Sequence, residues 1–183
     1  MSGLCACCGA LSYAVIDLET TGLVPGQDAV VEVGVVLVDA DGEPQDDWHS
    51  PVRPWRPLDA SHVHGIRETD LLGAPSFAEE GRVLVAHNVG FDAAMLTHEW
   101  RRLGQSRSWP TACTREAAEE LGLAGRRLPE LMEELGVERA GDAHRAASGA
   151  EGAAAVWWRL LNQARLRRVH LPLRGGRPLV ATR

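Results

Sequence analysis

The segment from Ala29 to Val38 constrains the fold of this chain more than any other. It reads Ala-Val-Val-Glu-Val-Gly-Val-Val-Leu-Val, an almost unbroken run of β-branched and aliphatic residues. Successive side chains of a strand point to opposite faces, so a strand that is apolar at nearly every position is covered on both faces. We therefore expect a central strand here, in a sheet that is packed on both sides.

Other segments supply the rest of the expected sheet. Ser12 to Leu18 and Val83 to His87 are short apolar runs of the kind found in buried strands. Asp41-Gly42 is a hairpin turn signal, and Trp48 to Val52 is the expected returning strand. Pro51, with a second proline three residues later, predicts that this third strand is short and lies at or near an edge of the sheet.

Three segments in the second half of the chain have helical patterns. They run from Asp92 to Leu103, onward from Pro129, and from about Arg145 to Ala164. Strands therefore come first and then alternate with helices. This order predicts an α/β fold, a mixed β-sheet with helices on both faces.

Length and composition suit one globular domain. The chain has 183 residues, 45% of them hydrophobic and 24% charged. We expect a flexible, cysteine-containing N-terminal tail over residues 1–11, one domain over residues 12–164 and a basic C-terminal tail over residues 165–183. No apolar run reaches the roughly 18–20 residues needed to cross a bilayer, and the N-terminus lacks the pattern of a secretory signal. We expect a cytoplasmic protein with no membrane partner.

The two expected tails have unusual compositions. Cys5, Cys7 and Cys8 gather in the first tail, but Cys113 is remote and no second paired motif is present, so we favour a reduced tail over a zinc site. No acidic residue follows Glu151, although the chain carries a net charge of −6. The arginine-rich C-terminal tail fits either a polyanionic partner or simple solvation.

The clearest chemical signal is the sequence Asp17-Leu18-Glu19, followed by Thr20-Thr21-Gly22. Residues two apart on a strand point to the same face, so Asp17 and Glu19 present neighbouring carboxylates. Adjacent anions need neutralisation, which a hard cation such as Mg²⁺ or Mn²⁺ provides. An isolated pair of this kind is more often an acidic turn. Here it ends an apolar strand and precedes a segment whose backbone can approach a ligand closely, so we favour a metal site.

Two further motifs follow along the chain. His87-Asn88-Val89-Gly90-Phe91-Asp92 comes after an expected strand and opens an expected helix, and His62-Val63-His64-Gly65-Ile66 lies between this motif and the first. An aspartate at a helix start is by itself most often an N-cap. A histidine in a loop near a turn is likewise often structural. The combination of these motifs with the first is more specific than any one of them.

Together these motifs resemble the DEDD superfamily of 3′–5′ exonucleases, in the branch with a catalytic histidine, and within it the proofreading subunits of bacterial replicative DNA polymerases. The resemblance spans about Tyr13 to Leu161 and implies an RNase H-like fold. It implies that Asp17, Glu19 and Asp92 bind two Mg²⁺ or Mn²⁺ ions and act in catalysis, with His144 as the general base. The residues that it places at the substrate are Thr20, Thr21, Gly22, Val63, His64, Asn88 and Phe91.

The third family motif is only half present. In the family a histidine on the last helix is followed five residues later by a fourth metal-binding aspartate, but here His144 is followed by Gly149. Glu151 lies roughly 200° around the helix from that position, and Asp142 is expected in the preceding loop. Neither residue replaces the missing ligand convincingly. We therefore expect weakened turnover, which Gly149→Asp should raise by orders of magnitude.

The sequence thus predicts a 3′–5′ exonuclease that removes nucleoside monophosphates from the 3′ ends of single-stranded or frayed DNA, or of short RNA, by two-metal-ion hydrolysis. Its expected partners are a nucleic-acid 3′ end and a DNA polymerase or another replication or repair protein. The alternative is a catalytically inactive nucleic-acid-binding or polymerase-associated module with the same fold. An unrelated metal phosphohydrolase fits least well.

Overall fold

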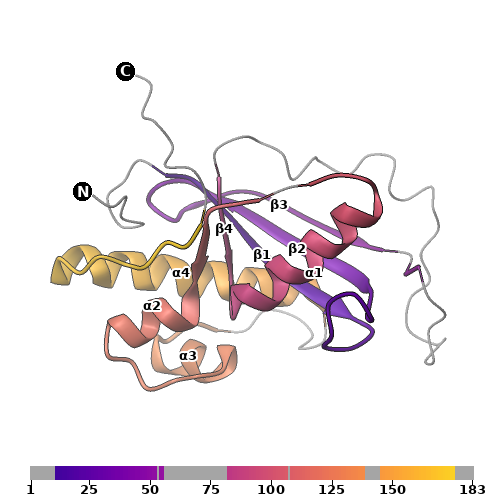
Figure 1. Cartoon of the computed structure of the whole chain (residues 1–183). Coiled ribbons are helices and arrows are strands. Elements are labelled where there is room, and N and C mark those ends of the chain that lie inside the picture. The colour runs from indigo at the N-terminus through magenta and orange to yellow at the C-terminus, as the bar shows by residue number, and fades with distance from the viewer. Residues whose placement is uncertain (1–10, 53, 56–81, 107, 139–144, 176–183) are drawn as a thin grey trace.

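The computed structural model describes residues 11–52, 54–55, 82–106, 108–138 and 145–175, and within these ranges the chain forms five strands and four helices (Figure 1). The strands are β1 Tyr13–Thr20, β2 Val30–Val38, β3 Pro44–Pro51, β4 Val83–Ala86 and β5 Thr111–Cys113. The helices are α1 Val89–Arg102, α2 Thr114–Glu120, α3 Leu128–Glu134 and α4 Ala146–Arg167.

All five strands belong to one mixed sheet with the order β3-β2-β1-β4-β5. Strand β2 is antiparallel to both β1 and β3, whereas β4 is parallel to β1 and β5 is parallel to β4. The predicted mixed α/β fold is therefore confirmed. Strand β2 is an interior strand buried on both faces, as its composition predicts, but the middle of the sheet belongs to β1.

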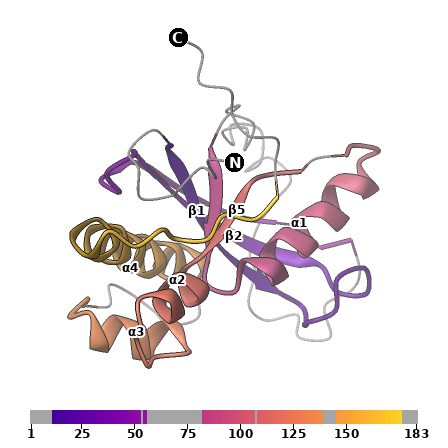
Figure 2. The same cartoon turned by 60° about the vertical axis from the view of Figure 1, so that its left-hand side comes forward.

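Helices α1 and α4 lie on opposite faces of the sheet, as Figure 2 shows. On the α4 face, Tyr13 and Val15 of β1 pack against the fully buried Trp157, whose ring meets the Tyr13 ring edge-on at a centroid distance of 5.4 Å. On the α1 face, Ile16 of β1 belongs to a second cluster with Met95. The alternation along β1 explains this division, because odd-numbered side chains face α4 and even-numbered ones face α1.

Two strands are longer than predicted. Strand β1 continues to Thr20, so Glu19 and Thr20 lie within the strand. Strand β3 is at the edge of the sheet, as predicted, but it spans eight residues and begins at Pro44 rather than at Trp48. Its two prolines occupy its ends, where a missing backbone donor interrupts the strand ladder least.

The second half of the chain departs from the prediction in two places. Helix α1 begins at Val89, three residues early, because Asn88 takes a left-handed conformation with φ of 71° and forms the N-cap. Asp92 is thus inside the first turn and is not the cap. Strand β5 and helix α2 were not predicted, since a three-residue strand and a seven-residue helix are too short to show a clear periodicity.

Helix α4 runs to Arg167, so the expected basic tail over residues 165–183 begins inside this helix. Beyond α4, the backbone of Arg174 exchanges two hydrogen bonds with Thr111 of β5, with N···O distances of 2.7 and 2.8 Å. Residues 176–183 and the cysteines of residues 1–10 lie outside the described ranges; the described cysteine, Cys113, is buried and free.

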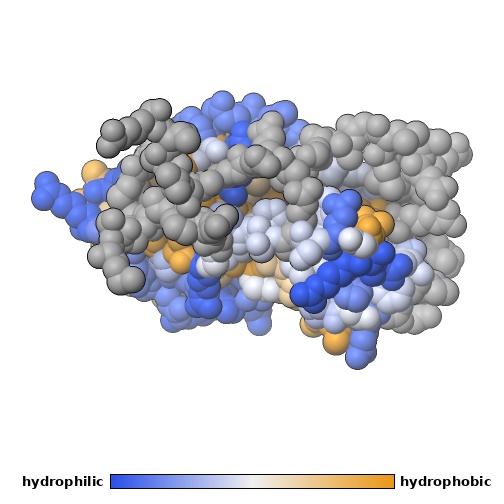
Figure 3. Space-filling view, turned by 45° about the horizontal axis from the view of Figure 1, so that its top comes forward, coloured by the Kyte–Doolittle hydropathy of each residue, from blue (hydrophilic) through white to orange (hydrophobic). Residues whose placement is uncertain are grey.

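Figure 3 shows one face of the molecule, and its described part is mainly hydrophilic. On the face shown in Figure 3, hydrophobic residues reach the surface only in small separate areas. Of the helices that the structure describes, none is long and apolar enough to cross a membrane.

Candidate active site

The acidic residues of the first motif lie on the sheet face that α4 covers. Asp17 pairs across the β1–β2 ladder with Gly34, and Glu19 pairs with Glu32. Residues directly opposite each other in an antiparallel ladder share a face, so these four positions lie side by side beneath the first turns of α4.

Gly34 allows α4 to approach the sheet at this point. A Cβ at position 34 would lie 2.7 Å from the backbone nitrogen of Ala147 and closer still to the carbonyl group of Ala146. The contact is with backbone atoms, which cannot rotate aside as a side chain can. A glycine inside a strand often marks such a close approach, and here it fixes the height of α4 above β1.

Gly149, the departure from the family pattern, lies directly over Asp17. A Cβ at position 149 would come within 2.5 Å of the Asp17 Cγ and within 3.1 Å of its Cβ. The Asp17 carboxylate therefore occupies the space that the stem of a fourth carboxylate would need. The sequence identified Gly149 as a missing ligand, but only the structure shows that Asp17 fills its place.

Asp92 reaches the same region from the first turn of α1. Its side chain is buried, with 4% exposed. Burial and the negative charge of Asp17 raise the pKa of the Asp92 carboxyl to about 8, although its own backbone N–H acts in the opposite direction. The fold therefore brings together two carboxylates from distant parts of the chain in a site where they repel each other.

A hard divalent cation fits this chemistry, because it would neutralise the repulsion and prefers carboxylate oxygens as ligands. As the side chains lie, however, no three His, Cys, Asp or Glu residues of the described ranges form a group that could hold a metal ion. Binding by Asp17, Glu19 and Asp92 would therefore need their carboxylates to turn toward a shared point.

Glu32 is a structural residue beside the site that the sequence did not identify. Its buried carboxylate accepts hydrogen bonds from Arg145 Nε at 3.0 Å and Nη2 at 2.8 Å, and from the backbone nitrogen of Ala146 at 3.1 Å. Burial by itself would raise the pKa of Glu32, but these hydrogen bonds outweigh burial and lower it. The pair fixes the start of α4 on β2. A single glutamate within an apolar strand was the available signal, since buried carboxylates are almost always paired.

The Thr-Thr-Gly segment forms an internally bonded loop. The Thr20 hydroxyl donates to the Gly22 carbonyl at 2.7 Å, and the Thr21 hydroxyl donates to Asp28 Oδ1 at 3.2 Å and accepts from Ala29 N at 3.0 Å. A Cβ on Gly22 would lie 2.6 Å from the Asp28 carboxylate. These contacts give the segment a structural role, and its predicted contact with substrate stays a prediction.

The residues of the second motif divide between structure and surface. Both ring nitrogens of His87 are engaged, Nδ1 with Thr114 Oγ1 at 2.9 Å and Nε2 with the Arg126 carbonyl at 3.0 Å. Burial is the largest cause that lowers the pKa of His87, which favours the neutral ring. The ring joins the end of β4 to the start of α2. Asn88 is exposed, and Phe91 is half-buried against the cluster on the α1 face.

Several predicted residues fall outside the described ranges. They are the proposed base His144, its neighbour Asp142, and the expected nucleotide contacts Val63 and His64. Glu151 is described: it is exposed and lines a pocket beside Asp47 of β3, which agrees with the prediction that it does not replace the missing ligand.

The chain is similar in sequence to known proteins over a range that includes Asp17, Asp92 and Gly149. Residues 14–157 match the exonuclease family RNase_T. A DNA polymerase III subunit epsilon-like protein from Rhodobacter capsulatus is 34% identical over 154 residues, which are 76% of this chain and 22% of that protein. A PolC-type DNA polymerase III from Oceanobacillus iheyensis is 30% identical over 166 residues, 83% of this chain and 12% of that protein. The chain thus spans less than a quarter of either relative.

Solved structures share the fold at low sequence identity. The nuclease domain of 3′hExo, a DEDDh family member bound to rAMP, matches with a TM-score of 0.67 at 16% identity, over 90% of this chain and 96% of that one. Exonuclease X in complex with 5′ overhanging duplex DNA matches with a TM-score of 0.61 at 24% identity, over 84% and 93%. The RNase H-like architecture expected from the motifs is therefore confirmed.

Proposed function

This chain belongs to the RNase_T exonuclease family, and we propose that it is a 3′–5′ exonuclease that removes nucleoside monophosphates from single-stranded or frayed DNA, with short RNA as a second substrate. The observation that carries this proposal is the convergence of Asp17 and the buried Asp92 on one region, where burial and the charge of Asp17 together raise the pKa of Asp92. A buried carboxylate held beside a half-buried one against their repulsion is more typical of a functional site than of a structural core.

In this proposal Asp17, Glu19 and Asp92 hold the cofactor, Mg²⁺ or Mn²⁺, with two ions as the expected number. When bound, the cations lower the pKa of a water molecule and stabilise the charges on the attacking and leaving oxygens of the phosphodiester. The raised pKa of Asp92 supports this assignment, because a carboxyl that resists ionisation alone gains most from a neighbouring cation.

Other residues of the chain bind the substrate and move the proton. We assign to His144 the removal of a proton from the attacking water, a role suited to a side chain that titrates near neutral pH. Phe91, Val63 and His64 would hold the terminal base and sugar through apolar and stacking contacts that accept any base. Asn88, exposed at the start of α1, would contact the same nucleotide.

Gly149 makes reduced turnover part of the proposal. Loss of groups that only support metal ligands commonly costs about 10–100-fold in affinity or activity, and loss of a direct ligand should cost more. The close approach of Asp17 to Gly149 supports this view, since the chain has no carboxylate stem at this position. The same observation favours the second candidate function, a catalytically inactive module that binds nucleic acid or a polymerase.

Association with a DNA polymerase, or with another replication or repair protein, is a further part of the proposal. Its support is that the curated relatives are named as DNA polymerase III proteins that are several times longer than this chain. In such an assembly the chain would supply the nuclease, and its partner would present the 3′ end.

The test is release of mononucleotides from a 3′-labelled single-stranded DNA in the presence of Mn²⁺. We expect slow release by the wild-type protein and none by Asp17→Ala. The matched control is Asp46→Ala, which removes an exposed carboxylate of β3 and should leave release unchanged. Tight binding of the strand without release would instead favour the inactive module, and neither binding nor release would refute both.

A further inference from the structure

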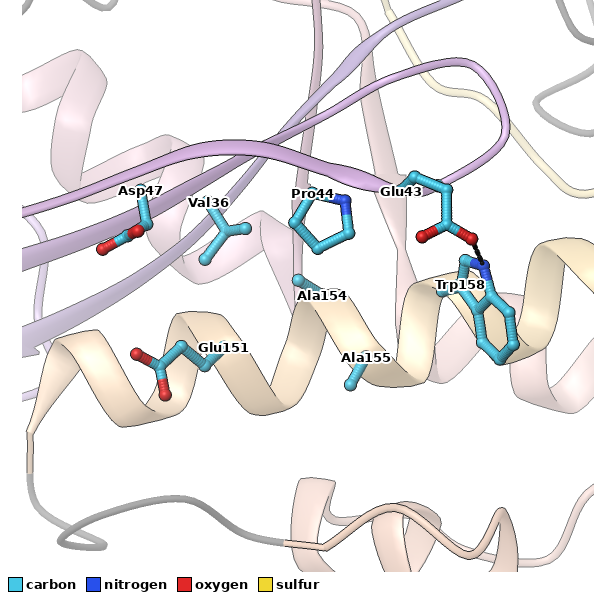
Figure 4. A pocket seen from close by; sticks show the side chains of 9 residues that line it. Val36, Glu43, Pro44, Asp47, Glu151, Ala154, Ala155 and Trp158 are labelled. Atoms are coloured by element: carbon cyan, nitrogen blue, oxygen red, sulfur yellow. Dashed lines mark hydrogen bonds between the residues drawn. The ribbon is translucent and has the colours of Figure 1, made fainter.

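A pocket of about 330 Å³ lies between the β2–β3 hairpin and α4 (Figure 4). The α4 residues that line it lie roughly 140–240° around the helix from Gly149, at about 100° per residue, so the pocket is separate from the Asp17–Gly149 contact. No role in the proposed nuclease reaction is assigned to any of its lining residues. The apolar and acidic residues that line the pocket therefore need an explanation other than the nuclease reaction.

The tip of the β2–β3 hairpin is attached to α4, and further along the helix only small side chains lie between α4 and the hairpin. This arrangement leaves the pocket open. Gly42, at φ of 87°, approaches the helix so closely that a Cβ there would lie 3.2 Å from Trp158 Cα. The Trp158 indole N–H donates to Glu43 Oε1 at 2.8 Å, and Arg165 pairs with Asp41 at 2.9 Å. These contacts hold the hairpin in place.

Further along α4, Ala154 points toward Pro44 of β3, and Ala155 lines the same pocket with Val36 of β2. Two alanines are too short to fill the space between the strand and the helix. The result is a hollow whose floor is apolar.

The rim of the pocket is acidic. Asp47 of β3 and Glu151 of α4 lie at the end away from Trp158 in Figure 4, and Glu43 lies at the other. None of the described residues that line the pocket is basic. Asp47 and Glu151 make no side-chain hydrogen bond or ion pair with the described part of the chain, and Glu43 is bonded to a neutral indole. These three carboxylates therefore have no cationic partner among the residues that the structure describes.

We propose that this pocket binds an arginine side chain from an extended segment of a protein partner. Arginine combines an apolar stem, which suits the floor, with a guanidinium that can bond two carboxylates at once. A nucleic acid is an unsuitable occupant, because three carboxylates would repel its phosphates. The exposed Arg159 lies over the ring of the pocket residue Trp158, with its guanidinium carbon 4.9 Å from the ring centroid, so this ring already accepts a guanidinium.

The position of β3 explains why the arginine should belong to a peptide chain. Strand β3 ends the sheet, so its outer edge pairs with none of the described strands, and the backbone groups of such an edge can pair with an added strand. An extended segment that adds to this edge gains main-chain hydrogen bonds, while its alternate side chains can enter a neighbouring pocket. The acidic pair Asp46 and Asp47 on β3 would favour a basic segment.

The test uses the blocked pentapeptide acetyl-Thr-Arg-Val-Arg-Thr-amide and its counterpart with citrulline in place of both arginines. Citrulline has the shape of arginine without its charge, so the pair isolates the guanidinium. The reporter is the ¹⁵N-labelled indole N–H of Trp158, which lies at the pocket and is assigned by its loss in Trp158→Phe. We expect the arginine peptide to shift this signal in a saturable manner, and the citrulline peptide to bind at least about tenfold more weakly.

Variants distinguish peptide binding in the pocket from peptide binding elsewhere on the surface. The double variant Asp47→Asn, Glu151→Gln should bind the arginine peptide at least about tenfold more weakly, and Ala155→Leu, which fills the hollow, should abolish binding. Glu119→Gln removes a carboxylate on α2 and should change nothing, with circular dichroism confirming that each variant is folded. Four results would each overturn the proposal. They are equal binding of both peptides, undiminished binding by the double variant, no shift up to about 10 mM peptide, and the same shift with a single-stranded oligonucleotide.

Discussion

The contact between Gly149 and Asp17 leads to the most specific prediction. A Cβ at position 149 would lie 2.5 Å from the Asp17 Cγ, whereas carbon atoms normally approach to about 3.5 Å, so the Asp17 carboxylate would have to move by about 1 Å. Overpacking of this kind costs about 1–3 kcal/mol. Alanine in place of glycine within a helix contributes about 1 kcal/mol in the opposite direction.

We therefore expect Gly149→Ala to leave the free energy of unfolding unchanged or to lower it by up to about 2 kcal/mol. In an Asp17→Ala background the carboxylate is gone and only the 3.1 Å approach to the Cβ of residue 17 remains, so the same substitution should raise the free energy of unfolding by at most about 1 kcal/mol. The difference between the two backgrounds is the coupling energy, which should be about 1–3 kcal/mol. Urea unfolding with EDTA present measures all four proteins of this cycle.

Gly90→Ala is the matched control, because position 90 is also helical and a Cβ there would meet nothing within 4 Å. Its effect should be the same whether residue 17 is aspartate or alanine. A coupling between positions 149 and 17 below about 0.5 kcal/mol would refute the reasoning. In that case the Asp17 carboxylate would not lie against Gly149 in solution.

Four further outcomes follow from the same structure. Gly149→Asp should displace Asp17 and raise nuclease activity at saturating Mn²⁺ by at least about tenfold, measured on a 3′-labelled strand; no gain would mean that the carboxylate at 149 does not take the fourth ligand's role. Gly34→Ala should lower the free energy of unfolding by about 1–3 kcal/mol or more, because its Cβ meets backbone atoms of α4; a thermal midpoint equal to the wild type would contradict this. Arg145→Met leaves the buried Glu32 carboxylate without its guanidinium, and since Arg145 is itself half exposed we expect a loss of about 1–3 kcal/mol in urea unfolding. Because the pKa of His87 is lowered from 6.5, the unfolded chain binds its proton first as the pH falls, so the contribution of His87 to the free energy of unfolding should decrease below pH 6.5 and stop decreasing under the lowered pKa. The raised pKa of Asp92 acts in the opposite direction over the same range, so the quantity to measure is the difference in free energy of unfolding between the wild type and His87→Gln. A difference that does not change with pH would contradict the lowered pKa of His87.

The sequence by itself determined the architecture and the first candidates for the site. The apolar run of β2 required a strand covered on both faces, and the spacing of Asp17 and Glu19 required two carboxylates on one face of β1. These features are local, because strand alternation and helix periodicity are written into neighbouring residues. Elements as short as β5 and α2 were missed, since three to seven residues carry too little of either pattern.

Only the tertiary structure decided what the missing fourth carboxylate means. Whether Gly149 is an open position or one filled by Asp17 depends on how closely α4 approaches β1, and that distance is set by Gly34 and by the pairing of Glu32 with Arg145. The pocket beside Trp158 has the same origin, because it depends on which small residues of α4 lie opposite the hairpin. Such contacts join positions far apart along the chain, and packing fixes their distances where no local pattern can.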